Sequence, residues 1–401
     1  MTDEFWQFVC DNRTADPAAL RLRYAGKLDA KVDFSLAITQ IECRRKFGKK
    51  IAKTLSDADN HFLFPSTLAG EQSTSDALAQ WHTDLVEADV TLTDMTAGLG
   101  IDCLHLARKA REVVAVERNP LLVDALKYNA EQCGVNNLTV VNGDSVALLE
   151  SGELRSNVVF IDPARRSASG GRVFAVSDCE PNIIALLPFM RQQFNIMIAK
   201  LSPMLDISEV CRSLPGITDI YAVGTANECK EVVARVDLSK SEEEEAVLIH
   251  AVTVSAEAEY NDICFTAAEE STIETQRVCP AVGDYLYEPA PAIMKAGAFN
   301  VFAQRFGLDK ISDNTHIYIC KERKDGVPAS VYMIEEIIPW QSKNLKRLNS
   351  RYPVGEVAVR NFGMTADALR KKLGVRNGDG VRILGVTDAQ SVRSLLVLKR
   401  I

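Results

Sequence analysis

The stretch that decides the fold is 94-DMTAGLGIDCLHLA-107, which follows an apolar run beginning at Thr91. Gly98 and Gly100 allow the backbone to approach a ligand closely, and the helical pattern after them would offer its N-terminal amides. The turn is not the dinucleotide-binding fingerprint, because Cys103 stands where GxGxxG requires glycine. No Walker lysine follows, which argues against an ATP-hydrolysing P-loop. The stretch therefore predicts a strand, a ligand-binding turn and a helix of an α/β sheet.

Similar apolar runs follow this turn, each succeeded by a turn and a helical pattern. They cover 111–117, 137–144, 156–163, 194–201 and 217–224. Strands that alternate with helices of this length predict a mostly parallel sheet covered on both faces. Two later runs, 231-EVVARVDL-238 and 246-AVLIHAVTV-254, flank the acidic segment 241-SEEEE-245. We expect them to form an antiparallel hairpin that closes the sheet.

The residues before and after this predicted sheet show other sequence patterns. Residues 1–88 are expected to be helical, because Ile38, Ile41, Ile51 and Leu55 recur near helical spacing and Asp16-Pro17 is typical of a helix start. Prolines and glycines around 280–297 indicate a boundary. A helix over about 292–306, strands and a basic helix then predict a small α+β module. The predicted domains are 1–88, 89–280 and 281–401.

Acidic residues stand at the ends of four successive predicted strands. They are Asp94, Glu117, Asp144 and Asp162. The carboxyl edge of an open α/β sheet is where ligands bind, so these side chains are expected to meet there. A single acid at such a turn would be explained as a helix cap. Four in succession favour a ligand site.

This arrangement resembles the class I S-adenosylmethionine-dependent methyltransferases over about residues 88–255. The resemblance implies that S-adenosylmethionine is the cofactor. Its methionine part would be held by Asp94 and the backbone of Ala97 to Gly100, including Gly98. Glu117 would bind the ribose, and Asp144 with Ser145 would bind the adenine.

The predicted acceptor site is the turn in 161-IDPARRSASGGRVF-174. In class I enzymes that methylate exocyclic amino groups, a [D/N]PP[Y/F/W] turn ends the fourth strand. There a carboxylate and a carbonyl accept the two N–H bonds of the amine and aim its lone pair at the sulfonium methyl group. Asp162 and the carbonyl of Pro163 match this pattern. Ala164 and Arg165 depart from it, because the second proline and the aromatic residue are missing.

A DPPR form of this turn resembles the RNA 5-methyluridine methyltransferases, which need a cysteine nucleophile at the end of the next strand. Leu201 occupies that position in 200-KLSP-203, so carbon methylation through a cysteine adduct is disfavoured. Nothing around the nearby Cys179 suggests activation. The glycine turn also resembles that of the small-subunit rRNA guanine-N2 methyltransferases. This likeness favours an amine acceptor.

The DPARR turn, the linker 285-YLYEPAPAIMKAG-297 and the basic tail together resemble a bacterial family of methyltransferases with a THUMP-like C-terminal domain. The matching THUMP domains bind structured RNA, often tRNA, so tRNA or rRNA is the implied partner. The residues expected to contact RNA are basic, and Arg165 is also expected to take part in catalysis by stacking on the base or by binding a phosphate. They are Arg165, Arg166, Lys200, Lys371 and Lys372.

Composition limits the alternatives. The net charge of −8 argues against indiscriminate coating of nucleic acid, although residues 339–401 hold 13 Lys/Arg against 4 Asp/Glu and 44-RRKFGKK-50 adds a second basic cluster. The ten cysteines form no CxxC or CxxH pair, so we expect reduced thiols in a cytoplasmic protein, with no metal site. No apolar run approaches the length of a membrane span, and the N-terminus has no secretion pattern.

The leading hypothesis is an enzyme that methylates an exocyclic amino group of a base in structured RNA, with guanine N2 ahead of adenine N6. Two alternatives stay open. One is a methyltransferase that acts on a protein or a small molecule. The other is a non-catalytic RNA-binding protein that retains the cofactor fold. The oligomeric state does not follow from the sequence.

Overall fold

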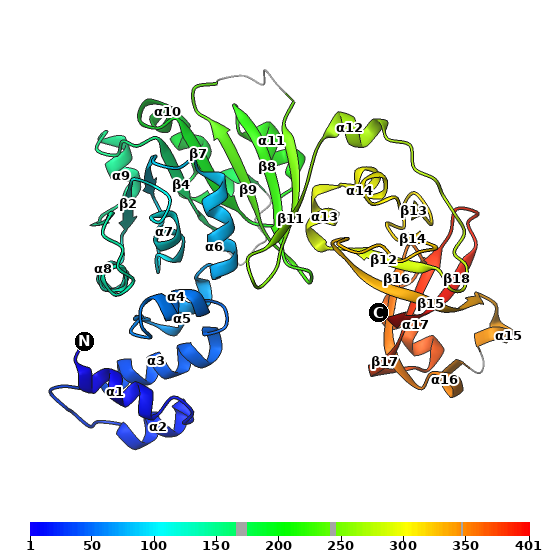
Figure 1. The fold of residues 1–401 in the computed structure, drawn as a ribbon, viewed down its shortest axis with the longest axis horizontal. Helices are drawn as coiled ribbons and strands as arrows, with labels where there is room; N and C mark the ends of the chain where they lie inside the picture. Colours follow the sequence, from blue (N-terminus) through cyan, green and yellow to red (C-terminus); the bar gives the residue numbers. More distant parts are fainter. Residues whose placement is uncertain (166–174, 241–245, 346–347) are drawn as a thin grey trace. The chain divides into compact units, whose positions relative to one another are not determined.

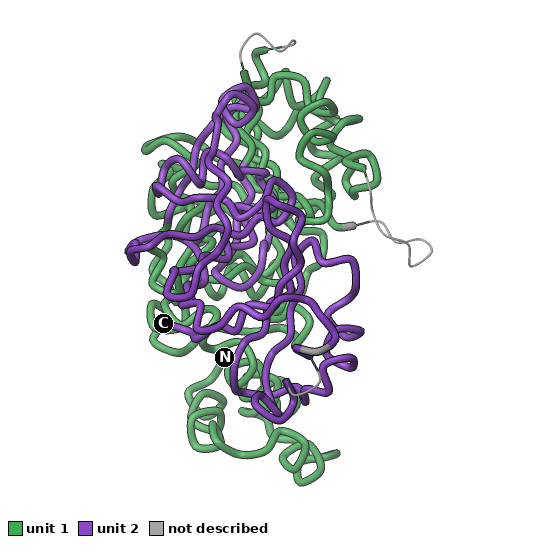
Figure 2. Tube along the Cα trace, turned by 90° about the vertical axis from the view of Figure 1, so that its right-hand side faces the viewer, with its two compact units in different colours: residues 1–220, 231–246, 254–260 green, residues 221–230, 247–253, 261–401 purple. Residues whose placement is uncertain are grey.

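The computed structural model describes residues 1–165, 175–240, 246–345 and 348–401 (Figure 1). The chain divides into two compact units (Figure 2). Unit 1 comprises 1–220, 231–246 and 254–260, and unit 2 comprises 221–230, 247–253 and 261–401. The predicted domain boundaries after residues 88 and 280 stay predictions.

Unit 1 begins with the helical segment that the sequence predicts. Its helices are α1 (Asp3–Asp11), α2 (Pro17–Tyr24), α3 (Phe34–Phe47), α4 (Ala52–Asp57), α5 (Thr67–Gln72) and α6 (Asp76–His82), followed by the 3₁₀ helix η1 (Thr83–Leu85). Asp16 caps α2, as expected from the Asp-Pro pair. The apolar faces of α1 and α3 share a core with Ala125 of α8 (Pro120–Gln132). The helical segment is thereby packed onto the sheet part of unit 1.

A nine-stranded sheet follows the helical segment. Its strands are β1 (Thr91–Asp94), β2 (Glu112–Glu117), β3 (Leu138–Asn142), β4 (Val158–Ile161), β7 (Ile196–Leu201), β8 (Ile217–Gly224), β9 (Cys229–Asp237), β10 (Leu248–Val254) and β11 (Tyr260–Thr266), in the order β11-β10-β8-β9-β7-β4-β1-β2-β3. The five from β3 to β7 in this order pair in parallel. Between them run α7 (Ile101–Leu106), α8, α9 (Ser145–Glu150) and α10 (Ile183–Gln193), and α11 (Ile207–Ser213) follows β7. The predicted mostly parallel α/β sheet is confirmed.

The closing hairpin is formed by other strands than predicted. The sequence pattern predicts that 231–238 pairs with 246–254. In the structure, β9 lies between β7 and β8 and is antiparallel to β7, while β10 lies on the other side of β8. The hairpin is instead β8 with β9, whose four-residue connection carries a hydrogen bond from Thr225 N to Glu228 O (2.9 Å). A short connection makes sequential neighbours pair more readily than strands joined across a longer acidic segment.

Unit 2 contains a seven-stranded sheet of order β13-β14-β12-β15-β18-β17-β16. Its strands are β12 (Tyr285–Pro289), β13 (Asp309–Lys310), β14 (Tyr318–Cys320), β15 (Ala329–Pro339), β16 (Val354–Arg360), β17 (Arg376–Thr387) and β18 (Arg393–Arg400). Its helices are α12 (Ala267–Thr272), α13 (Pro291–Ala296), α14 (Phe299–Phe306), α15 (Ser342–Leu345), α16 (Leu348–Arg351) and α17 (Ala366–Leu373). The single helix expected over 292–306 is two helices, because Gly297 adopts a left-handed φ of 75° that ends α13. No helix in the described part of the chain is both long and apolar enough to cross a membrane.

Candidate functional site

The four acidic residues lie at one edge of the nine-stranded sheet, in the part that belongs to unit 1, as expected from the strand ends. Asp94 and Glu117 are the last residues of β1 and β2, Asp144 follows β3 by two residues, and Asp162 follows β4 directly. Because β3, β2, β1 and β4 are parallel neighbours, their carboxyl ends lie side by side. The edge therefore presents a row of carboxylates beside the glycine turn.

Asp94 shapes the glycine turn from inside. Its side chain is 2% exposed, and its oxygens accept hydrogen bonds from Thr96 N (2.9 Å) and Cys103 Sγ (3.0 Å). Burial raises the pKa of Asp94 to about 6, against the hydrogen bonds, which lower it. Both oxygens are thus engaged by the loop itself. Asp94 therefore fixes the turn between β1 and α7.

The two glycines of the turn are required for different reasons. Both have positive φ, 55° for Gly98 and 84° for Gly100. A Cβ on Gly100 would lie 2.1 Å from a Leu126 methyl, so this glycine permits close packing against α8. A Cβ on Gly98 would meet only Thr96 O, at 3.9 Å, so Gly98 opens onto free space that a ligand can fill.

Glu117 ties the second strand to this turn. Its Oε2 accepts from Gly98 N (3.0 Å) and its Oε1 accepts from Asn119 N (2.7 Å). Each carboxylate oxygen has a second lone pair, so the partly exposed side chain can still accept from two ligand hydroxyls. Glu117 therefore supports the turn and keeps acceptor capacity on both oxygens.

The remaining predicted cofactor contacts lie at the same edge. The amide of Ala97 donates to Val116 O (3.2 Å) and its carbonyl accepts from Gly100 N (2.9 Å), so Ala97 is part of the turn's own hydrogen bonding. Asp144 is exposed and caps α9 by accepting from Val146 N (2.9 Å). Ser145 is the first residue of α9. The capping role and a contact with adenine do not exclude each other, because each carboxylate oxygen accepts more than one bond.

The acceptor turn is fixed by contacts on both sides of Asp162. Its amide donates to Thr96 Oγ1 (2.7 Å), and its carboxylate Oδ2 lies 2.8 Å from Lys200 Nζ while the side chain is 49% exposed. Pro163 is buried, and the backbone of 164–165 (β5) pairs with Cys179–Glu180 (β6). Arg166, predicted to contact RNA, lies outside the described residues. The structure thus presents the Asp162 carboxylate on a firmly held backbone.

Cys179 lies in this turn but is 3% exposed, with its backbone paired to Arg165. A cysteine nucleophile must reach the substrate, and this burial does not suit one. The sequence-based argument against a cysteine adduct is consistent with this position.

Lys200 was expected to contact RNA, and its position does not suit that role. The residue is 6% exposed at the end of β7, and three oxygens lie around its ammonium. They are Asp162 Oδ2 (2.8 Å), Thr74 Oγ1 (3.0 Å) and Asp102 Oδ2 (3.2 Å). The ammonium thus donates hydrogen bonds to Thr74 and Asp102 and forms an ion pair with Asp162, so it is engaged within the protein.

The ammonium belongs to a larger group of ionisable side chains, which we call the Lys200 cluster. Its members are Lys200, Asp102, Asp162, His82 and Glu231. The imidazole of His82 is fully buried between two carboxylates, with Nδ1 2.7 Å from Asp102 Oδ1 and Nε2 2.6 Å from Glu231 Oε1. The cluster connects α6, α7, β7 and β9 with the acceptor turn.

Mutual attraction favours the ionised forms of His82, Lys200 and Asp102 in the cluster. Burial acts to lower the pKa of His82, but the charges of Glu231 and Asp102 raise it to about 9. Burial likewise acts to lower the pKa of Lys200, and the charges of Asp102, Asp162 and Glu231 raise it well above its usual range. Burial acts to raise the pKa of Asp102, and Lys200 and His82 hold it well below its usual range. Two buried cations therefore face three carboxylates.

Sequence reasoning missed His82, Asp102, Glu231 and Thr96 as parts of the site. One usable indication was present: Lys200 and Glu231 stand inside otherwise apolar strand patterns, where a charge must be paired to be buried. The partners of these charges could not be identified from the sequence, because the five members of the Lys200 cluster come from five separate regions of the chain.

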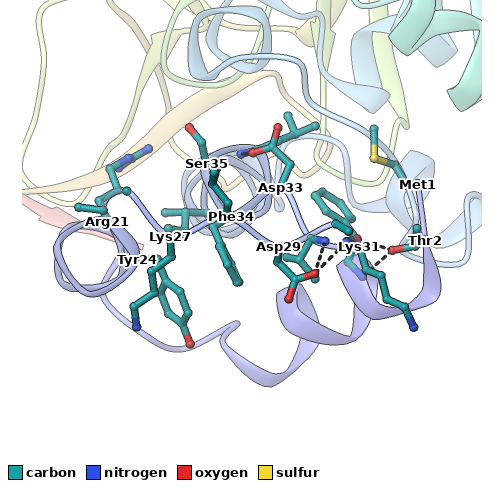
Figure 3. A pocket seen from close by; sticks show the side chains of 18 residues that line it. Met1, Thr2, Arg21, Tyr24, Lys27, Asp29, Lys31, Asp33, Phe34 and Ser35 are labelled. Carbon is teal, nitrogen blue, oxygen red and sulfur yellow. Dashed lines mark hydrogen bonds between the residues drawn. The ribbon is translucent and has the colours of Figure 1, made fainter.

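A cavity of about 90 Å³ lies between the glycine turn and the end of α5. Its walls include Gly98, Asp94, Asp162 and, from the helical segment, Gln72 and Thr74. A larger cavity, of about 840 Å³, lies within the helical segment (Figure 3). There Asp29 accepts from the amide of Lys31 (2.8 Å), and Arg21 pairs with Glu42 (2.6 Å). Its charged groups serve the local fold, so the smaller cavity is the candidate site.

The basic residues away from this edge differ in whether they are exposed or are bound within the protein. Lys371 and Lys372 are exposed at the end of α17, and Lys372 Nζ lies 4.8 Å from the centre of the Trp340 ring. In the cluster 44–50, Arg44 donates to Asn60 O and Phe62 O (2.8 and 2.7 Å), and Lys50 donates to Glu71 O (2.9 Å). Arg44 and Lys50 thus support the helical segment, while Lys371 and Lys372 remain the better candidates for phosphate contacts.

Three family models match separate parts of the chain. Residues 77–169 match the family described as conserved hypothetical protein 95, residues 285–328 match a ferredoxin-like domain, and residues 329–400 match a THUMP domain-like family. A crystal structure from Porphyromonas gingivalis W83, described as a candidate methyltransferase, is 28% identical with a TM-score of 0.83 over 99% of this chain and 97% of that one.

Curated relatives match shorter stretches. An uncharacterized RNA methyltransferase of Gloeobacter violaceus is 32% identical over 97 residues, and one of Mycoplasma mobile is 25% identical over 104 residues. These matches cover 24% and 26% of this chain, but only 18% and 29% of the relatives' own lengths. They relate one part of this chain to one part of each relative.

Proposed function

We propose that this protein, whose chain combines a methyltransferase-type α/β fold with a ferredoxin-like and THUMP-like C-terminal module, methylates an exocyclic amino group of a base in structured RNA. Guanine N2 is the first candidate acceptor and adenine N6 the second. The observation that carries the proposal is the Asp162 carboxylate, held beside the glycine turn with Oδ2 bound to Lys200 and Oδ1 without a partner among the described residues.

S-adenosylmethionine is the proposed cofactor, and it would supply an electrophilic methyl group on a sulfonium. Three features of the sheet edge support its binding. Gly98 leaves free space above the turn, Glu117 can accept from two hydroxyls, and Asp144 is exposed where an adenine amino group could donate. The small cavity suits the amino-acid end of the molecule, and the nucleoside would lie along the open edge.

The amine acceptor follows from what Asp162 offers. An aromatic amine is a weak nucleophile because its lone pair is delocalised into the ring. A carboxylate oxygen and the Pro163 carbonyl that accept its two N–H bonds would localise the lone pair and direct it at the methyl carbon. This mechanism needs an ionised carboxylate and no cysteine adduct. The missing aromatic residue leaves Arg165 as the proposed partner for the base face or a phosphate.

RNA is the proposed substrate on three grounds. The C-terminal range matches a THUMP-like family, and the two curated relatives above are named as RNA methyltransferases. Exposed basic residues on α17 provide candidate phosphate contacts in an otherwise acidic protein. A cytoplasmic location is proposed with this function.

Nucleoside mass spectrometry tests the proposal. Purified protein and labelled S-adenosylmethionine would be incubated with unmodified tRNA and rRNA, and the same RNAs would be compared between wild-type and deletion strains. We expect one N-methylated base to appear in vitro and to be missing from the deletion strain. A methyl group on a ring carbon or a ribose oxygen would contradict the amine acceptor. Cofactor binding without transfer to any RNA would favour the non-catalytic alternative.

Replacing Glu117 with Ala should weaken S-adenosylmethionine binding about ten- to a hundredfold, because the ribose loses a charged acceptor worth roughly 1.5–3 kcal/mol. Part of the loss would come from the turn, since Gly98 N also loses its partner. Calorimetric titration measures the effect. Glu117→Gln is the control, because its amide oxygen can keep the bond to Gly98 N. An Ala variant that binds as tightly as the wild type would refute the ribose contact.

Replacing Lys371 and Lys372 with Ala should weaken RNA binding and flatten its dependence on salt. Each phosphate contact on a single strand contributes a log–log slope of about −0.7, so the double variant should lose up to about 1.4. Binding titrations at several salt concentrations measure the slope. Ala at the exposed Lys321 and Lys324 of the same unit is the charge-matched control. An unchanged slope in the Lys371/Lys372 variant would leave α17 without a role in RNA binding.

A further inference from the structure

The Lys200 cluster surrounds one side of the proposed acceptor site and leaves the other side open. Lys200 and Asp102 are almost completely buried, whereas about half of the Asp162 side chain is exposed. Lys200 contacts Oδ2 of Asp162 only, and Asp162 Oδ1 has no partner among the described residues. Asp162 is thus the one carboxylate of the cluster with an oxygen available to the cavity.

The position of Lys200 is itself fixed by residues from three other elements. Thr74 Oγ1 accepts from Lys200 Nζ and donates to Asp102 Oδ2 (2.5 Å). Asp102 is held in turn by His82, which Glu231 holds from β9. A lysine so constrained has little freedom to move toward solvent. Its ammonium therefore acts as a rigid support for the carboxylate that it contacts.

We propose that Lys200 is a positioning residue for the methyl acceptor, because it holds one oxygen of Asp162 and so directs the other toward the incoming amine. This inference rests on the proposed function of Asp162. It also gives the helical segment a part in the reaction, since Thr74 and His82 keep Lys200 in place. The catalytic contact is made by Asp162, and Lys200 acts through it.

The charges of the cluster predict what removal of Lys200 does. The groups that face Asp162 through the cluster are Lys200, Asp102, Glu231 and His82, and buried Asp94 lies next to Asp102 on the side of the glycine turn. Without the ammonium, the Asp162 carboxylate lies near Asp102 and Glu231, and His82 is the remaining cation among the described members of the cluster. Like charges repel, so Asp162 should no longer be held in the orientation that offers Oδ1 to the amine.

The test compares Lys200→Met with Lys200→Arg in the full-length protein. Met has a similar volume and no charge, whereas Arg keeps the cation. We expect Lys200→Met to lower kcat roughly 30- to 100-fold with KM for RNA and cofactor affinity nearly unchanged, as for the loss of one aligned contact in the reaction. Lys200→Arg should recover most of the lost kcat.

A double variant, Lys200→Met with Asp102→Asn, covers the case in which Lys200→Met does not fold. It removes one positive and one negative charge, so the net charge of the buried cluster is the same as in the wild type. It should fold, bind the cofactor and show the same loss of kcat. An unchanged kcat in a folded variant would overturn the proposal.

A crystal structure of the Lys200→Met or the double variant separates this inference from the proposed function. We expect the Asp162 side chain to leave the rotamer seen here, or to populate several, while the turn from Asp94 to Gly100 keeps its conformation. An Asp162 carboxylate that keeps its orientation would overturn the positioning role even if the wild type proved active on RNA. If the wild type proved inactive on every RNA, the proposed function would fail and this structural readout would still decide the role of Lys200.

Discussion

Replacing Asp162 with Ala is expected to lower the rate of methyl transfer at least about 100-fold, while the affinity for S-adenosylmethionine changes little. The reason is that Asp162 is the carboxylate with a free oxygen at the open side of the site, whereas Glu117 and the glycine turn form the rest of the edge. The protein should remain folded, because Lys200 keeps Asp102 as its buried counter-ion. Single-turnover assays measure the rate, and calorimetry measures cofactor affinity.

Two further variants make this result specific. Asp162→Asn keeps the shape but replaces one acceptor oxygen by a donor, so its rate should fall nearly as far as that of Asp162→Ala. Asp124→Ala removes an exposed carboxylate of α8 and should leave the rate unchanged. A fully active Asp162→Ala enzyme would exclude the amine-positioning mechanism. Parallel loss of cofactor binding would instead assign the turn a structural role.

The sheet and its ligand edge were predictable because they follow from local patterns. Each parallel strand is a short apolar run ended by a turn, and the acids Asp94, Glu117 and Asp162 stand at those ends. Parallel strands end at one edge, so their spatial proximity follows from the fold class without further information. Residue types at strand ends were therefore enough to locate the edge.

Strand pairing beyond the parallel part was less predictable, because it depends on contacts distant in sequence. β17 contains 376-RNGDG-380, which is typical of a turn, yet it continues a strand of twelve residues. In its ladder with β16, Val354 pairs with Arg376 and the next residue, Gly355, pairs with Val381, so 377–380 bulge out of the register. A bulge of this kind interrupts the alternation of apolar and polar residues, so the strand cannot be recognised from that pattern.

The roles of the residues within the site could not be predicted from sequence patterns, because they depend on contacts between distant parts of the chain. Asp94 fits the predicted pattern at the end of β1, but its burial and its bonds to Thr96 and Cys103 turn it toward the loop. Lys200 ends an apolar strand, and only the fold brings it to Asp102 and Asp162. The members of such a cluster are far apart in the sequence. A buried charge needs a partner, but the sequence does not show which residue the fold brings to it.

Stability of unit 1 should fall by roughly 2 kcal/mol between pH 6.5 and about pH 8.5, and His82→Gln should remove this fall. Burial acts to lower the pKa of His82, yet Glu231 and Asp102 raise it to about 9 from the ordinary value of 6.5. A raised pKa means that the folded state binds the proton more tightly. The stabilisation is complete below pH 6.5 and is lost as the pH rises through 9.

The His82→Gln variant should also be the less stable protein at pH 6.5, by about 3–5 kcal/mol, because Asp102 and Glu231 lose a shared buried counter-ion. The difference from the wild type should narrow as the pH rises, since the wild type loses its proton while glutamine has none to lose. Urea midpoints followed by circular dichroism across this range measure both effects. The thiols of Cys43 and Cys133, whose pKa burial raises to about 11, contribute only at higher pH. The Lys371/Lys372 double variant, altered outside the cluster, should keep the wild-type fall. A His82→Gln protein with the same pH dependence as the wild type would show that the imidazole is neutral between its two carboxylates.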